Sequence, residues 1–187
     1  DTLISGLDDP IESTKADELA DAVAARCNRG DLWALGPHRL LCGDARSAED
    51  VGRLIEGREM DLIFTDPPYN VPIDGHVSGK GKARHEEFAF ASGEMTRTEF
   101  ESFLVETLTP AADACKDGAI AYVCMDWRHM HELLNAGDAV FTELKNLCVW
   151  NKTNAGMGTF YRSKHELVFV FKKGKGAHTN AFKLGET

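Results

Sequence analysis

The sequence predicts an α/β fold built around a mostly parallel, doubly wound sheet. Short apolar runs with the length of buried strands alternate along the chain with segments whose apolar residues recur at helical spacing, and this alternation is typical of such sheets. The 187 residues, of which 43% are hydrophobic and 27% charged, suffice for one ordinary globular domain with its own core.

In the first third of the chain, capping residues and apolar spacing predict two helices and three short strands. A turn at Gly36 and Pro37 joins the first two strands, and Ser47 is the expected cap of the second helix. Strand, helix and strand within about 30 residues favour a βαβ unit. The expected elements are a helix over 13–28, strands over 31–35 and 39–42, a helix from Ser47, and a buried parallel strand over 60–65.

The alternation resumes after a long irregular stretch that extends to Gly93. Thr96 and Glu99 form a capping box at the start of a helix, and Pro110 is expected to kink or restart that helix. Further along, the sequence predicts a strand over 118–124, a helix over 126–134, and strands over 144–150 and 165–171, the last two as a candidate antiparallel pair. These strands complete the predicted sheet.

The charge is unevenly distributed along the chain. The net charge is -9, which by itself argues against a nucleic-acid partner. From Lys145 to the end, however, eight basic residues face two acidic ones, so this part carries +6 and the preceding 144 residues carry -15. The basic part could face a polyanion. A merely solvated lysine-rich terminus is the alternative.

Cysteine usage and hydropathy favour a cytoplasmic protein. The five cysteines are scattered and form no Cys-x-x-Cys pair. No apolar run approaches the roughly 18 residues that a membrane span needs, and the N-terminal residues show no secretory pattern. His129, His131 and Glu132 suggest a zinc site, but residues two apart on a helix face different sides, so we expect surface positions and no metal site.

The stretch Asp66-Pro67-Pro68-Tyr69 follows the predicted strand over 60–65. The carboxyl ends of strands are where open α/β sheets place their ligands. The two prolines stiffen the turn because each fixes its own φ and restricts the residue before it. A stiff turn can hold a carboxylate and a backbone carbonyl as two acceptors beside an aromatic ring. This combination suits a planar group that bears an exocyclic NH2.

Asp-Pro-Pro-Tyr after an apolar strand resembles the catalytic motif of the S-adenosylmethionine-dependent DNA amino-methyltransferases, which modify adenine N6 or cytosine N4. Asn70-Val71 directly after it is a common form in the permuted beta group of that family. Asp44, 22 residues before Asp66, resembles the acidic motif that reads the cofactor's adenine. The segment 150–166, from Trp150-Asn151-Lys152 to His165-Glu166, resembles the last motif of the catalytic half.

The resemblance covers roughly residues 31–173 and implies a Rossmann-like methyltransferase fold for this catalytic region. Residues 1–30 are then a lead-in helix or linker, and residues 174–187 the start of a target-recognition segment or linker. The family's Phe-x-Gly-x-Gly cofactor loop is not found. We therefore expect the fold to be incomplete at its C-terminus and this chain to be the catalytic half of a longer enzyme.

The resemblance also implies a chemistry and a set of site residues. The Asp66 carboxylate and the Pro67 carbonyl would accept the hydrogens of a flipped base's amino group, and Tyr69 would stack on the base. The catalytic candidates are Asp66, Pro67, Pro68 and Tyr69, and the candidates for binding S-adenosylmethionine are Asp44, Ala45 and Asp66. The candidates for contacting the base or DNA are Tyr69, Asn70, Lys80, Lys82, Arg84, Lys152, Tyr161, Arg162 and Lys164.

Several alternatives stay open at this point. Asp44 could be a helix cap, Tyr161 a packed tyrosine, and the basic residues a solvated face. The leading Asp66 favours adenine N6 over cytosine N4. Methylation of RNA or of a protein glutamine, and an inactive DNA-contacting fragment of a phage or bacterial protein, are the other functions considered. The expected partner is double-stranded DNA, and a homodimer is left open.

Overall fold

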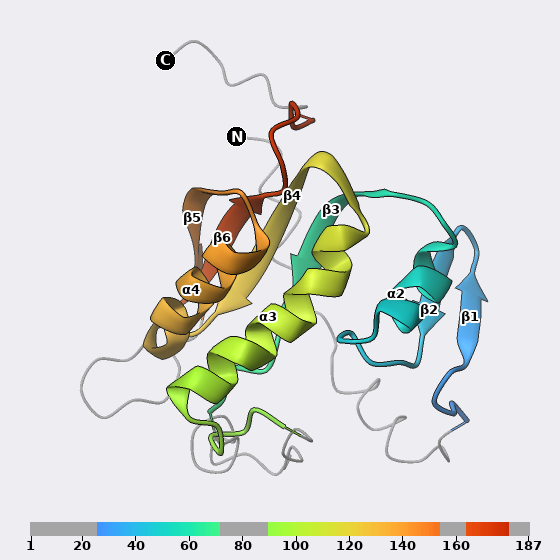
Figure 1. Ribbon diagram of the computed structural model, residues 1–187. Coiled ribbons are helices and arrows are strands. Elements are labelled where there is room, and N and C mark those ends of the chain that lie inside the picture. The colour runs from blue at the N-terminus through green and yellow to red at the C-terminus, as the bar shows by residue number, and fades with distance from the viewer. Residues whose placement is uncertain (1–25, 72–89, 154–163, 180–187) are drawn as a thin grey trace.

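The computed structural model describes residues 26–71, 90–153 and 164–179. In chain order the elements are β1 (Leu32–Leu35), β2 (His38–Leu41), α2 (Ala48–Ile55), β3 (Met60–Thr65), α3 (Arg97–Asp113), β4 (Cys115–Met125), a 3-10 helix (Trp127–His129), α4 (Met130–Val140), β5 (Glu143–Asn151) and β6 (His165–Lys172). The helices α3 and α4 lie on one side of a four-stranded sheet (Figure 1). The expected helix over 13–28 falls largely outside the described residues.

The α/β class is confirmed, and the main sheet is mixed. Its strand order is β3-β4-β6-β5. The β3–β4 pair is parallel, whereas β4–β6 and β5–β6 are antiparallel. The final antiparallel pair that the sequence left open is therefore present. No helix intervenes between β5 and β6 in the described residues, as is usual for antiparallel neighbours.

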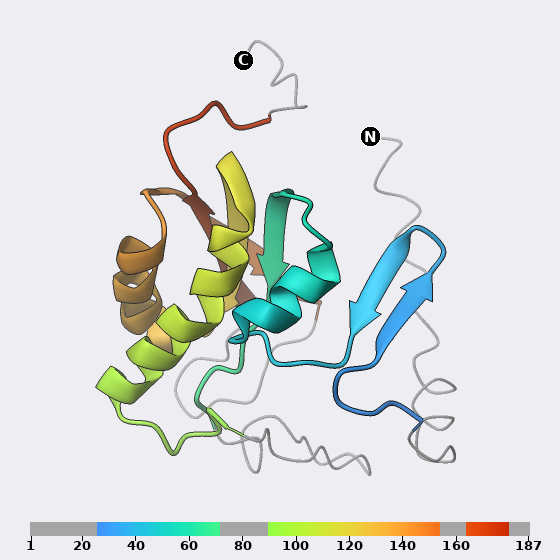
Figure 2. The ribbon, with the colours of Figure 1, turned by 45° about the vertical axis from the view of Figure 1, so that its right-hand side comes forward.

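The predicted βαβ unit over residues 39–65 is wrong. β2 pairs antiparallel with β1 in a separate two-stranded sheet, which stands apart from the main sheet beside α2 (Figure 2). Gly36 adopts a φ of 62° in the connecting turn, a conformation that closes a tight local hairpin at little cost. The helix that crosses between parallel strands is α3, which joins β3 to β4.

The core lies between the main sheet and the two helices. The capping box of Thr96 and Glu99 is confirmed at the start of α3, and α3 buries four large apolar residues at helical spacing. These are Phe100, Phe103, Leu104 and Leu108. The expected restart at Pro110 is wrong, because α3 continues through it to Asp113. No helix in the described part of the chain has the length and apolarity to cross a bilayer.

On the opposite face of the sheet, the described residues leave part of β3 uncovered. β3 was expected to be a buried strand, but among its apolar residues only Ile63, which belongs to the core, is buried. Leu62 and Phe64 are 52% and 68% exposed. Successive residues of a strand point to opposite faces, so these two lie on the face away from Ile63. The described helices thus supply one layer of the expected doubly wound arrangement.

Candidate active site

The ends of four strands meet at one edge of the main sheet. β3 and β4 run parallel with Thr65 opposite Val123, so their C-terminal ends lie side by side. β6 begins at this edge because it runs antiparallel to β4, with Leu167 opposite Met125. β5 runs antiparallel to β6, with Asn151 opposite His165, so β5 ends at this edge. Residues that follow β3 and β5 or begin β6 can therefore converge, at the kind of edge where open α/β sheets bind ligands.

The predicted catalytic turn lies at this edge. Asp66 is exposed directly after β3, Pro67 is buried, and Pro68 is half-buried. The Tyr69 hydroxyl donates a hydrogen bond to Oδ1 of Asp66 at 2.5 Å. Burial of Tyr69, together with the neighbouring Asp66, raises the pKa of its hydroxyl above the usual value. The hydroxyl therefore keeps its proton, and a carboxylate acceptor and a tyrosine lie side by side.

Glu166 and Lys152 extend this arrangement from the neighbouring strands. Glu166 begins β6, opposite Trp150 of β5, and its Oε1 lies 3.4 Å from the Tyr69 hydroxyl. Its Oε2 lies 2.6 Å from Nζ of Lys152. A polar chain thus runs from Asp66 through Tyr69 and Glu166 to Lys152. Cys124 lies near both carboxylates, and burial raises the pKa of its thiol, which argues against a thiolate nucleophile here.

Asn70 fixes the far side of the turn. It has a φ of 53° and is only 7% exposed. Its Nδ2 donates to the Met95 carbonyl at 2.9 Å, and its Oδ1 accepts from the backbone N–H groups of Gly93 and Met95 at 3.0 and 3.2 Å. These contacts favour a structural role over the predicted DNA contact, because the buried amide is already engaged with backbone.

Asp44 is held by its own loop. Its carboxylate accepts hydrogen bonds from the backbone N–H, Nε and Nη2 of Arg46 at 2.9, 3.0 and 2.8 Å. These hydrogen bonds lower the pKa of Asp44 to about 2. Asp44 is not the cap of the following helix. The cap of α2 is Ser47, whose side chain accepts a hydrogen bond from the backbone N–H of Asp50. Ala45, the other predicted cofactor contact in this loop, is exposed.

The structure describes only part of the predicted DNA-binding set. Lys164 is exposed, and its carbonyl accepts from the backbone N–H of Lys152 at 2.8 Å, just beyond the β5–β6 ladder. The remaining five candidates lie outside the described residues: Lys80, Lys82, Arg84, Tyr161 and Arg162.

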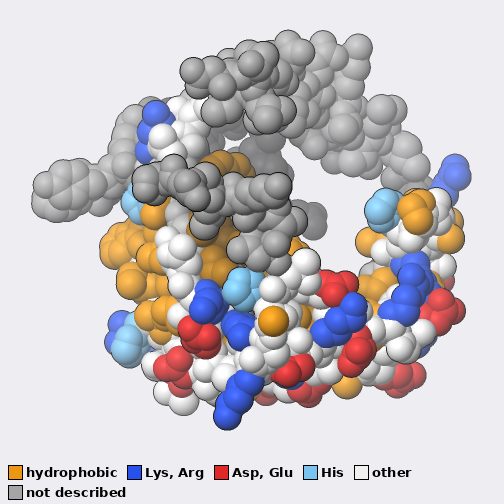
Figure 3. Space-filling view, turned by 90° about the horizontal axis from the view of Figure 1, so that it is seen from above, with side chains coloured by type: hydrophobic (Ala, Val, Ile, Leu, Met, Phe, Trp, Pro, Cys, Tyr) orange, Lys and Arg blue, Asp and Glu red, His pale blue; other side chains and the backbone are white. Residues whose placement is uncertain are grey.

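Part of the basic charge near the C-terminus is paired. Lys145 lies 3.0 Å from Glu143, Lys152 contacts Glu166, and Lys173 lies 3.2 Å from Asp113. Figure 3 shows the molecule from above, and on the face seen there acidic and basic side chains are mixed over the described surface. The charge asymmetry of the sequence therefore does not become a single basic patch on that face.

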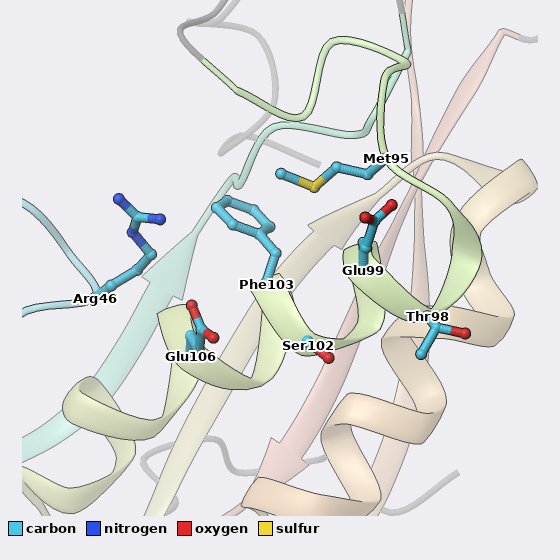
Figure 4. Close-up of a pocket in the computed structure, with 7 residues that line it drawn as sticks. All are labelled: Arg46, Met95, Thr98, Glu99, Ser102, Phe103 and Glu106. Carbon is cyan, nitrogen blue, oxygen red and sulfur yellow. The ribbon is translucent and has the colours of Figure 1, made fainter.

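A cavity of about 310 Å³ lies between the Asp44 loop and α3. Arg46 faces Phe103 and Glu106 across it (Figure 4). Its lining residues are Arg46, Met95, Thr98, Glu99, Ser102, Phe103 and Glu106. None of them belongs to the predicted site.

The surface position expected for Glu132 is wrong. Glu132 is 1% exposed and lies 3.1 Å from Nε of Arg97, a contact between α4 and α3 that offsets its buried charge. His129 Nδ1 lies 3.8 Å from the same carboxylate. Within the described ranges, no group of three or more His, Cys, Asp or Glu side chains is arranged to hold a metal ion.

A comparison with protein families decides the family of the chain. A family model for N6/N4 methyltransferases, described as DNA methylase, matches residues 60–186. The chain belongs to this family. The matched range begins at β3 and contains the turn from Asp66 to Tyr69 as well as Lys152 and Glu166, so the polar chain at the sheet edge lies within the DNA methylase region. Asp44 lies before it.

Solved structures resemble the chain at low identity. The crystal structure of M1.HpyAVI matches with a TM-score of 0.49 and 17% identity, over 77% of this chain and 62% of that one. The M1.HpyAVI–SAM complex gives 0.47, 16%, 75% and 60% for the same quantities. TTHA0409 of Thermus thermophilus, described as a DNA modification methylase, gives 0.44, 15%, 74% and 54%. The chain thus spans less than two thirds of these proteins.

Proposed function

We propose that this chain is the catalytic part of a DNA methyltransferase that transfers a methyl group from S-adenosylmethionine to adenine N6 after base flipping. The observation that carries the proposal is the pairing of Asp66 with Tyr69 at the end of β3, inside the DNA methylase match. The leading Asp supports adenine, with cytosine N4 as the alternative. Double-stranded DNA is the proposed partner, and a bacterial or phage origin is part of the same proposal.

The exposed Asp66 carboxylate and the Pro67 carbonyl are the proposed acceptors for the two hydrogens of the target amino group. An exocyclic amino nitrogen is a poor nucleophile because its lone pair is delocalised into the ring. Two acceptors that draw its hydrogens out of the ring plane localise that lone pair. Flipping the base costs a few kcal/mol, and stacking on Tyr69, worth about 1–3 kcal/mol per base, offsets part of this cost.

The residues of the site fit S-adenosylmethionine in charge. This cofactor carries a cationic sulfonium and a cationic ammonium group, and it supplies an electrophilic methyl group when bound. Asp66 is an exposed carboxylate and suits these positive charges, whereas the Asp44 carboxylate is paired with Arg46 and its proposed role is toward the cofactor's adenine. We propose that Asp44, Ala45 and Asp66 hold the cofactor. Lys152, Lys164 and the basic candidates outside the described residues are the proposed DNA contacts.

The test is transfer of a labelled methyl group by the full-length protein to duplex DNA, with the products resolved by base. We expect label on adenine N6, and we expect the Asp66→Ala variant to lose it. Label on cytosine N4 would replace adenine with cytosine as the target. If the full-length protein binds S-adenosylmethionine yet labels neither base, an inactive DNA-contacting protein becomes the better description.

A further inference from the structure

The Tyr69 hydroxyl lies between two carboxylates and can donate its single proton to only one of them. Asp66 Oδ1 is 2.5 Å from the hydroxyl oxygen and Glu166 Oε1 is 3.4 Å away. In this structure Asp66 is the nearer acceptor. The Asp66 carboxylate has room for more than one hydrogen bond, but under the proposed function it must also accept a hydrogen from the target amino group, so the two donors compete for its charge. A donated hydrogen bond from Tyr69 weakens it as an acceptor.

Glu166 is held in place by its strand and by an ion pair. Its backbone belongs to the β5–β6 ladder, opposite Trp150. Its other oxygen lies 2.6 Å from Nζ of Lys152, and the Glu166 side chain is 20% exposed. Partial burial makes such a pair more than a solvated surface contact. The two strands thereby hold a second carboxylate beside the Tyr69 hydroxyl.

We propose that Glu166, oriented by Lys152, is a positioning residue that takes over the Tyr69 hydrogen bond when the target amino group reaches Asp66. The proton stays on Tyr69, in accord with its raised pKa, and only the acceptor changes. Without Glu166 the half-buried hydroxyl would keep its bond to Asp66 or lose its partner, and a lost partner for a buried polar group is costly. This inference rests on the proposed function; it adds Glu166 to the site and gives Lys152, already a proposed DNA contact, a second role.

A double-mutant cycle on the full-length protein tests the inference. We expect Glu166→Ala to lower kcat about tenfold with little change in the KM for DNA, the effect of one lost hydrogen-bond partner. In a Tyr69→Phe background no hydroxyl needs a second acceptor, so the same change should alter kcat by less than about twofold. Glu166→Gln keeps an acceptor oxygen and should restore part of the activity.

Lysine variants separate orientation of Glu166 from DNA binding. Lys152→Met should lower kcat when Tyr69 is present and have a smaller effect in the Tyr69→Phe background. Lys145→Met is the matched control, because Lys145 lies on β5, the strand that Lys152 directly follows, and pairs with the exposed Glu143. It should leave kcat unchanged. Loss of DNA affinity with unchanged kcat in Lys152→Met would leave this lysine its proposed DNA contact and overturn its role in orienting Glu166.

The outcomes also separate this inference from the proposed function. If Glu166→Ala lowers kcat equally in both backgrounds, or has no effect with Tyr69 present, the acceptor exchange is wrong while methyl transfer stands. If the wild-type protein transfers no methyl group, the proposed function fails. NMR spectra of the protein with labelled tyrosine then still test the contact. The Tyr69 signal should differ between the wild type and Glu166→Ala, and the Tyr122 signal should not.

Discussion

Asp44 and Asp66 each follow a short strand, but their carboxylates meet different partners. Asp44 is bound by Arg46, two residues further along, and this pairing lowers its pKa to about 2. Asp66 instead accepts from Tyr69, which lies next to Glu166 at 97 residues' distance along the chain. The first carboxylate is a fixed charge set by local sequence. The second belongs to a chain of contacts that only the sheet assembles.

The largest expected effect separates the proposed roles of these two residues. Asp66→Ala should lower kcat by about 10²- to 10⁴-fold, the range for removing a group that manages a proton in the reaction. Asp44→Ala should mainly weaken cofactor affinity, by about tenfold, because it removes one charge-assisted contact. Methyl-transfer kinetics and equilibrium binding of S-adenosylmethionine measure the two. A loss of kcat as large in Asp44→Ala as in Asp66→Ala would break the distinction.

A second prediction concerns the Asn70 clamp, by which we mean the three hydrogen bonds between the Asn70 side chain and the backbone of Gly93 and Met95. Asn70→Ala should reduce the free energy of unfolding by about 2–4 kcal/mol, since it removes three hydrogen bonds of a buried amide and places an alanine at positive φ. Asn70→Gly removes the same hydrogen bonds but tolerates the φ of 53°, so it should cost about 1 kcal/mol less.

Urea unfolding of both variants measures these costs. Equal losses for Asn70→Ala and Asn70→Gly would assign the whole effect to the amide contacts. An Asn70→Gly variant as stable as the wild type would show that the clamp contributes nothing to stability.

The smallest expected effect is the pH dependence of the Asp44 pairing. The pKa of Asp44 is lower in the folded protein than its ordinary value of 3.8, so the pairing stabilises the fold above about pH 4 and this contribution is lost as the pH falls toward 2. Its size should stay below about 1 kcal/mol because the pair lies at the surface. The difference in unfolding free energy between wild type and Arg46→Gln should shrink from about pH 6 to about pH 3.

Arg58→Gln provides the control for this measurement. Arg58 lies 3.9 Å from Glu56, and both side chains are well exposed. We expect no pH-dependent difference for this variant. A constant difference for Arg46→Gln over the same pH range would show that Arg46 stabilises the loop through packing on Phe90, 4.8 Å from its guanidinium, and not through Asp44.

Local signals in the sequence predicted local structure well. The helix starts are marked by Ser47, Thr96 and Glu99, whose capping contacts span three residues. Contacts between residues this close in sequence can be predicted from a short sequence motif. The position of Asp66 at the end of a parallel strand was equally predictable, from an apolar run followed by two prolines. Lys152 was predicted as a DNA contact and Glu166 as part of the same motif, but their ion pair was not predicted.

The errors come from pairings between distant segments. β2 could pair with β1 through a hairpin turn or with β3 through a helical crossover. The strand, helix and strand spacing favoured the crossover, whereas β2 pairs with β1. Glu132 looked like a surface residue because its position on α4 does not reveal Arg97 on α3. Glu166 received no role because its proximity to Tyr69 follows from the register of β5, β6 and β4. The antiparallel final pair was the available signal for the contact with Lys152, since it places the start of β6 beside the end of β5.

The Asn70 clamp also bears on how the segment between its two ends can vary in length. Residues 70 and 93–95 are fixed to one another by the side-chain amide, so the catalytic turn and the start of α3 keep their geometry independently of what connects them. The entropy of closing a loop grows slowly, by about 0.6 kcal/mol for each doubling of its length. A change in the length of this connection should therefore cost little stability and leave the turn from Asp66 to Tyr69 in place.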